Sequence, residues 1–132
     1  MKTLIVEDDY ITSQVMQEIM LGFGECEAAE NGSQAIAIFQ RAVDTKENFD
    51  FVLLDIMMPE MDGQQVLEKF RAIEYDAGIK GLDTCKIVMT TALDDFDNIK
   101  TAFRNQAEGY IVKPIDKDKV VKVLEDLKIK DS

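Results

Sequence analysis

Residues that could carry out phosphoryl chemistry follow short apolar runs at four places in this 132-residue chain. In chain order they are Glu7-Asp8-Asp9, Asp55, Thr90-Thr91 and Lys113-Pro114. Carboxylates that are held together repel one another, and Mg²⁺ relieves that repulsion because it prefers oxygen ligands. A carboxylate can also be the nucleophile that accepts a phosphoryl group. We therefore predict a site in which Asp8, Asp9 and Asp55 bind Mg²⁺, or Mn²⁺ in its place.

The charge that develops on a phosphoryl group in transfer needs a cation and hydrogen-bond donors. Lys113 can supply the cation and Thr91 the hydroxyl group. Each residue alone has a structural explanation: Asp8 and Asp9 as a helix cap and first-turn acids, Asp55 as a turn residue, and Lys113 as a surface charge. Their joint occurrence at strand ends favours a site.

The elements that would position these residues are short apolar runs alternating with helical patterns. The expected strands are Leu4–Val6, Cys26–Ala29, Phe51–Leu54, Ile87–Met89 and Tyr110–Val112, of which the second is the weakest pattern. Apolar residues at helical spacing follow each strand, and Asn31-Gly32-Ser33 is expected to cap the second helix. The fourth helix is expected to start at Asp94 or Asp95 and to carry Phe96, Ile99, Ala102 and Phe103 on one face.

Alternating strands and helices predict an α/β fold with a mostly parallel sheet, right-handed crossovers and helices on both faces. Sites in such sheets form beyond the carboxyl ends of the strands, where the four polar groups fall. The length suits one domain, residues 1–132, and we expect no output domain because few residues follow the last helix near Lys128. The loops at Asp44–Asn48 and Tyr75–Thr84 are long for such a fold, so a partner contact and solvent-exposed padding both stay open for them.

Composition narrows the class of function. The formal net charge of −11 argues against direct binding to nucleic acid or to an anionic membrane surface. The chain has no histidine, so it cannot form a Ser-His-Asp system or carry a phosphohistidine itself. Two cysteines are too few for a zinc site, and reduced thiols are expected, although one disulfide is conceivable. The N-terminal apolar run is too short for a signal peptide or a membrane span, which predicts a cytoplasmic protein.

Four motifs in order resemble the receiver domains of response regulators, across essentially the whole chain. They are Glu7-Asp8-Asp9, the stretch Asp55-Ile-Met-Met-Pro-Glu-Met-Asp-Gly63, Thr91-Ala92, and Tyr110-Ile-Val-Lys113-Pro114. The resemblance implies a doubly wound, flavodoxin-like fold of five strands and five helices with the sheet order 2-1-3-4-5. It also implies a cis peptide bond between Lys113 and Pro114.

By the same resemblance, Asp55 is the phosphoacceptor, and Asp8 and Asp9 bind the metal ion together with the backbone carbonyl of Met57. Thr91 would be the switch hydroxyl, and Lys113 would pair with the phosphoryl group. Tyr110 would change rotamer and reshape the surface formed by the fourth helix, fifth strand and fifth helix. Such a protein is a signalling switch that catalyses only its own phosphorylation and autodephosphorylation.

The implied partners are a sensor histidine kinase or a histidine phosphotransfer protein, which supplies the phosphohistidine, and a downstream protein target. The chain would be a monomer or a weak, phosphorylation-dependent dimer. One alternative is a receiver-like interaction module that works without phosphate, although the complete set of site residues argues against it. A flavodoxin-like enzyme is disfavoured because Glu7-Asp8-Asp9 would repel a cofactor phosphate. An aspartyl phosphatase would need a second acid where Met57 stands.

Overall fold

The computed structural model describes residues 1–92, 100–102 and 106–128. Five parallel strands form one sheet in the order β2-β1-β3-β4-β5, as the family resemblance implied. The strands are β1 (Thr3–Val6), β2 (Cys26–Ala29), β3 (Phe51–Asp55), β4 (Lys86–Thr91) and β5 (Gly109–Val112). The helices are α1 (Tyr10–Leu21), α2 (Gly32–Asp44), α3 (Gly63–Asp76) and α5 (Lys117–Asp126), with a short 3₁₀ turn at Gly81–Asp83.

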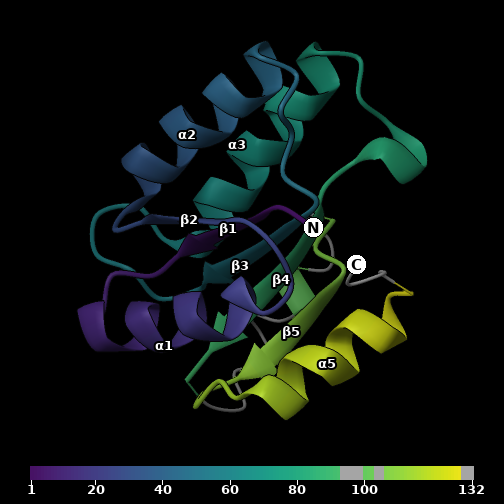
Figure 1. The fold of residues 1–132 in the computed structure, drawn as a ribbon. Coiled ribbons are helices and arrows are strands. Elements are labelled where there is room, and N and C mark those ends of the chain that lie inside the picture. The colour runs from purple at the N-terminus through teal and green to yellow at the C-terminus, as the bar shows by residue number, and fades with distance from the viewer. Residues whose placement is uncertain (93–99, 103–105, 129–132) are drawn as a thin grey trace.

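The helices lie in two layers, α2 and α3 on one face of the sheet and α1 and α5 on the other (Figure 1). The alternation of side chains along each strand produces this arrangement, since successive residues point to opposite faces. In β1, for example, Leu4 and Val6 pack toward α2 and α3, whereas Ile5 packs toward α1 and α5. Both faces of the central strands are therefore buried, which explains their continuous apolar runs.

Side-chain caps fix the point at which each of these helices begins. Asp9, Asn31, Asp62 and Asp116 are the N-cap residues, and each accepts a hydrogen bond from a backbone N–H three residues further on. The expected cap at Asn31 is confirmed. Most of the helix expected from Asp94 or Asp95 lies outside the described residues, of which residues 100–102 are helical.

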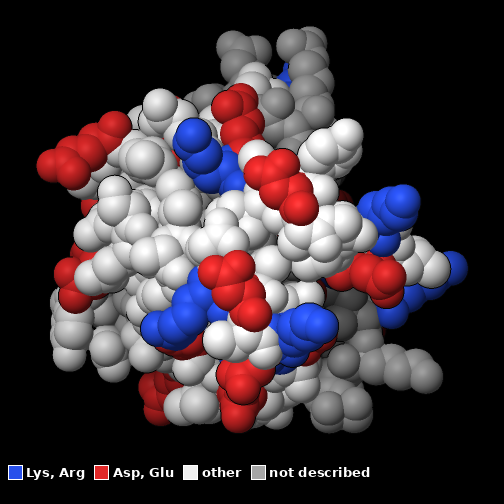
Figure 2. All heavy atoms as spheres, turned by 90° about the horizontal axis from the view of Figure 1, so that it is seen from above, with Lys and Arg blue, Asp and Glu red and all other residues white. Residues whose placement is uncertain are grey.

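The outer surface carries charges of both signs. Figure 2 looks onto the α2–α3 side and shows acidic and basic side chains interspersed, with no continuous basic patch among the residues that are described in this view. In the part of the chain that the structure describes, no helix is long and apolar enough to cross a membrane. The two cysteines are free: Cys85 is buried and Cys26 is half-buried.

Candidate functional site

The register of the sheet brings acids from two neighbouring strands together at its carboxyl edge. Val6 of β1 lies opposite Leu54 of β3, so Glu7 and Asp55, each one residue further on, are neighbours. Asp55 is in turn paired with Thr90 of β4. The predicted edge site is thus built from adjacent strands, as expected for polar residues at the ends of parallel strands.

Asp55 is a buried carboxylate with a cation beside it. The residue is 3% exposed, and the Lys113 Nζ lies 3.4 Å from its Oδ1. The backbone N–H of Met57 donates a hydrogen bond of 3.2 Å to the same oxygen. Burial, followed by the negative charge of Glu7, raises the pKa of Asp55 to about 7, although Lys113 opposes the shift. Positive charge that binds beside Asp55 therefore favours its ionised form.

Lys113 makes two ion pairs with the acids of the site, and the one with Glu7 is the shorter. The Lys113 Nζ lies 2.6 Å from Glu7 Oε1, and the Glu7 side chain is fully buried. The other carboxylate oxygen of Glu7 accepts a 3.1 Å hydrogen bond from the backbone N–H of Asp9. Burial alone would lower the pKa of Lys113, but the hydrogen bond that Lys113 donates to Glu7 and the charge of Asp55 raise it above its usual value. Lys113 is therefore a charged ammonium shared between two acids.

The acids that are placed to hold a metal ion differ from the predicted set by one residue. Among the described residues, Glu7, Asp8 and Asp55 form a group in which one carboxylate oxygen from each residue lies within 4.8 Å of the other two. Three clustered carboxylate oxygens suit a hard divalent cation. The residues present therefore fit the Mg²⁺ site that the sequence suggested, with Glu7 in the place expected for Asp9.

Asp9 caps α1 and is not part of this group of acids, so its assignment to the metal site needs correction. Its carboxylate accepts hydrogen bonds from the backbone N–H of Thr12 at 2.8 Å and from the hydroxyl of Thr12 at 2.5 Å, which caps α1. These bonds, first the one from the hydroxyl, lower the pKa of Asp9. The helix cap, one of the two explanations that the sequence offered, is the one that the structure supports.

The sequence contained a signal for Glu7. Glu7 stands two residues after Ile5, and Asp55 stands two residues after Leu53. Ile5 and Leu53 pack on the same face of the sheet. Because side chains alternate along a strand, Glu7 and Asp55 must share that face at the strand ends.

The other predicted site residues lie on β4, β5 and the β3–α3 loop. Thr91 is buried at the end of β4, and its carbonyl accepts a 2.6 Å hydrogen bond from the backbone N–H of Lys113. Tyr110 is on β5 with 42% of its surface exposed, and the Met57 side chain is 64% exposed. The peptide bond between Lys113 and Pro114 is cis, as the family resemblance implied.

Exchanging Asp8 and Asp9 separately tests which acid belongs to the metal site. We expect saturating Mg²⁺ to raise the midpoint of thermal unfolding of the unmodified protein by about 5 °C, because the ion binds only the folded state. Asp8→Asn should lose most of this rise. Asp9→Asn should keep it, because asparagine also caps helices. Thermal scans with and without Mg²⁺ measure both, and the reverse pattern would restore Asp9 to the site.

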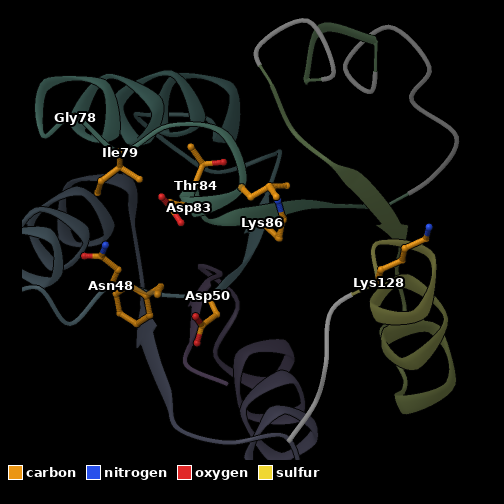
Figure 3. Close-up of a pocket in the computed structure, with 10 residues that line it drawn as sticks. Asn48, Asp50, Gly78, Ile79, Asp83, Thr84, Lys86 and Lys128 are labelled. Carbon is orange, nitrogen blue, oxygen red and sulfur yellow. The ribbon is translucent and has the colours of Figure 1, made fainter.

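A separate hollow of about 680 Å³ lies at the other end of the strands, where β3 and β4 begin. Figure 3 shows residues that line it. Its lining comes from the starts of β3 and β4, the loop after α3, and Lys128. Asp50, Asp83, Lys86 and Lys128 give it acids and bases in equal number. This hollow includes parts of both long loops noted in the sequence, and nothing in its charge selects one class of ligand.

Three comparisons with known proteins agree on the family. The model of the response regulator receiver domain matches residues 3–125. The chain is 35% identical over 117 residues to a cyclic di-GMP phosphodiesterase of Thermotoga maritima, and the match covers 87% of this chain but only 27% of that protein. It is 30% identical over 125 residues to the chemotaxis protein CheY of Bacillus subtilis, covering 93% of each.

A solved structure supports the same assignment. One chain of the crystal structure of the CheX–CheY–BeF₃⁻–Mg²⁺ complex from Borrelia burgdorferi superposes with a TM-score of 0.79 at 29% identity, covering 98% of this chain and 90% of that one. Receiver domains are signalling switches, not metabolic enzymes, and they bind Mg²⁺ at an acidic pocket. The fold, the acid cluster and these matches show that this chain belongs to the response regulator receiver domain family of two-component signalling.

Proposed function

We propose that this chain accepts a phosphoryl group on Asp55 from a partner's phosphohistidine and passes the change to a downstream protein. The observation that carries the proposal is the position of Asp55: a buried carboxylate at the end of β3, with the Lys113 ammonium 3.4 Å from its Oδ1. A carboxylate in that position can act as a nucleophile, and the ammonium can balance the charge that arrives with the phosphoryl group.

In the transfer, an oxygen of Asp55 forms a bond to phosphorus while the bond from phosphorus to the imidazole nitrogen of the partner breaks. The electron pair stays on the imidazole, which then takes a proton from solvent. Asp55 must be ionised to attack, and its pKa of about 7 means that binding of positive charge beside it favours the reactive form. Lys113 supplies one such charge in the resting state.

The metal ion would be held by Glu7, Asp8 and Asp55, with the backbone carbonyl of Met57 as a further ligand. When bound, Mg²⁺ would neutralise charge on the phosphoryl oxygens and orient them. The protein's own contribution is to hold the nucleophile rigid: Asp55 ends a strand that is hydrogen-bonded on both sides, and Met57 N–H fixes its Oδ1. Asp9 is outside this set because it caps α1.

The switch would work through Thr91 and Tyr110. Phosphorylation adds charge and acceptor oxygens at Asp55, and the Thr91 hydroxyl would turn toward them. The carbonyl of Thr91 is hydrogen-bonded to the backbone of Lys113, so the end of β4 and the start of the β5–α5 loop are linked. Tyr110, which is exposed in this state, would turn inward and change the face that β5 presents with α5.

A partner that delivers the phosphoryl group needs a surface beside Asp55. Such a surface is present: Ile11 and Val15 of α1, with Pro114 and Ile115, form a shallow apolar hollow next to Lys113. Ile11 is 73% exposed and Val15 is 44% exposed. Apolar side chains that are exposed around a reactive group favour docking of a protein, here a histidine kinase or a histidine phosphotransfer protein, over a small donor alone.

Phosphorylation by a small donor tests this function directly. We expect the protein to gain one phosphoryl group, measured by intact mass, when it is incubated with acetyl phosphate and Mg²⁺. The gain should be absent from Asp55→Asn and absent when the metal ion is chelated. If the unmodified protein gains nothing over a range of Mg²⁺ concentrations, the phosphorylation-independent interaction module becomes the better description.

A further inference from the structure

Thr90 carries a second hydroxyl group at the edge of the site. Its side chain is fully buried, and in the described part of the structure its Oγ1 has no hydrogen-bond partner. A buried hydroxyl group without a partner destabilises the fold, because it has lost its hydrogen bonds to water and gained none in return. A valine would fill the same space without this cost, so packing alone does not account for a threonine here.

The side chain of Thr90 lies on the same face of the sheet as Asp55. The two residues are paired in register across β3 and β4. Two residues before each site position, every one of these strands has an apolar residue that packs on the α1–α5 side of the sheet. These residues are Ile5, Leu53, Val88 and Ile111. Because side chains alternate, the next residues on this face are Glu7, Asp55 and Thr90.

The side chain of Lys113 must span the end of β4 to make its contacts. Lys113 follows β5, whereas its ammonium contacts Glu7 after β1 and Asp55 of β3. In the sheet order, β4 separates β5 from β3. Neighbouring strands are about 4.8 Å apart, so the lysine side chain spans the end of β4. At that end, Thr90 is the residue on this face.

We propose that Thr90 is a positioning residue for Lys113, whose ammonium donates a hydrogen bond to the Thr90 hydroxyl when it leaves Glu7 for a phosphoryl group on Asp55. The inference rests on the proposed function. An ammonium group has three donors and needs acceptors for them when it is partly buried. The phosphoryl oxygens draw it from Glu7, and the Thr90 hydroxyl, on the strand between β5 and β3, replaces the acceptor that it loses. The Thr90 hydroxyl, which has no partner in the resting state, thus gains one in the phosphorylated state.

Three variants separate the hydroxyl group from packing. Thr90→Val removes the hydroxyl and keeps the shape, and Thr90→Ser keeps a hydroxyl. Thr3→Val is the matched control, because Thr3 is also a buried strand threonine with an unpartnered Oγ1, at the other end of the sheet. The measurements are thermal unfolding, the rate of phosphorylation by acetyl phosphate with Mg²⁺, and the affinity for BeF₃⁻ with Mg²⁺ by ¹⁹F NMR.

We expect Thr90→Val to unfold at the same temperature as the unmodified protein or higher, but to lose about tenfold in phosphorylation rate and in BeF₃⁻ affinity, as for one hydrogen bond to a charged group. Thr90→Ser should stay within about twofold, and Thr3→Val should be unchanged. In a Lys113→Met background, Thr90→Val should have no further effect on BeF₃⁻ affinity, because the two residues act as a pair.

The outcomes that would overturn the inference differ from those that would overturn the function. Unchanged phosphorylation and BeF₃⁻ affinity in Thr90→Val, or equal losses in Thr90→Ser or Thr3→Val, would reject a role for the Thr90 hydroxyl and leave the phosphoacceptor function in place. An unmodified protein that takes up neither a phosphoryl group nor BeF₃⁻ would reject the function, and this inference with it.

Discussion

Arg71→Met is expected to lower the free energy of unfolding by about 3–5 kcal/mol, because it leaves two largely buried carboxylates without their cation. The Arg71 side chain is 11% exposed, and its guanidinium contacts Glu74 Oε1 at 2.6 Å and Glu108 Oε1 at 2.8 Å. It also donates a 2.9 Å hydrogen bond to the carbonyl of Cys85. Chemical denaturation of the variant and of the unmodified protein measures the loss.

The carboxylates of Glu74 and Glu108 serve as hydrogen-bond acceptors at a place where β4 begins before its neighbour β5. The first pair of these strands is Val88 with Gly109, so backbone N–H groups earlier in β4 have no strand beside them on that side. Glu74 accepts the N–H of Cys85 at 2.6 Å, and Glu108 accepts the N–H of Ile87 at 2.6 Å. Arg71 neutralises both acceptors. The two carboxylates therefore satisfy backbone N–H groups that no neighbouring strand reaches. Without the arginine, these carboxylates would be buried charges with no cation beside them.

Arg41 provides the control for this prediction. Its guanidinium contacts Glu27 at 2.8 Å, a similar distance, but the two side chains are 62% and 38% exposed. Exposed ion pairs contribute about 0–1 kcal/mol, so Arg41→Met should be nearly neutral. Adding Glu74→Gln and Glu108→Gln to Arg71→Met should restore part of the stability. A loss in Arg71→Met no larger than that in Arg41→Met would show that the carboxylates are better solvated than their burial indicates.

Local pattern was sufficient for the strands and for most of the helices. Buried parallel strands are continuous apolar runs, and amphipathic helices have a 3.6-residue period, so both leave a signal in a short window. Even the weak pattern at Cys26–Ala29 was confirmed as a strand. Among the described strands, the predicted runs differ from the structure at their ends: β4, for example, runs from Lys86 to Thr91, beyond the apolar core at Ile87–Met89, because pairing with β3 and β5 holds its polar ends.

The site was harder to predict because it depends on contacts between strands. The acids that follow β1 form a run of three, and strand alternation and the helix cap, not residue type, decide which of Glu7, Asp8 and Asp9 join the site. The contacts of Arg71 lie 35 and 37 residues away at Gln106 and Glu108, and no local pattern marks them. Residue spacing predicts which strand ends meet, whereas the register decides which side chains touch.

Asp55→Asn is expected to raise the free energy of unfolding by about 2 kcal/mol at pH 8 in the absence of divalent metal, and by less at pH 5. Burial and the charge of Glu7 raise the pKa of Asp55 to about 7, whereas an unfolded chain ionises it near 3.8. Between these values the folded protein holds a proton that the unfolded chain has released. Stability in this range therefore falls as the pH rises, and it has lost the full contribution above pH 7.

Asparagine does not titrate, so the stability of the variant does not fall with rising pH through this position. The figure of about 2 kcal/mol is well below the full linkage value, because Asp55→Asn also removes the ion pair between Asp55 and Lys113. Denaturation at pH 8 and pH 5 with a chelator present measures the gap. A gap that is the same at both pH values would show that the acid cluster does not destabilise the fold.

The same repulsion has a functional consequence that Mg²⁺ makes testable. The unmodified protein should gain stability from saturating Mg²⁺ at pH 8, because the ion offsets the repulsion between Glu7, Asp8 and Asp55. Asp55→Asn removes one ligand and one charge, so its gain should be smaller and the gap between the two proteins should narrow. The acids that cost stability in the free protein are those that would bind the metal ion and accept the phosphoryl group. A site of this kind trades stability for reactivity, and substitutions that relieve the repulsion should make the fold more stable and the switch inactive.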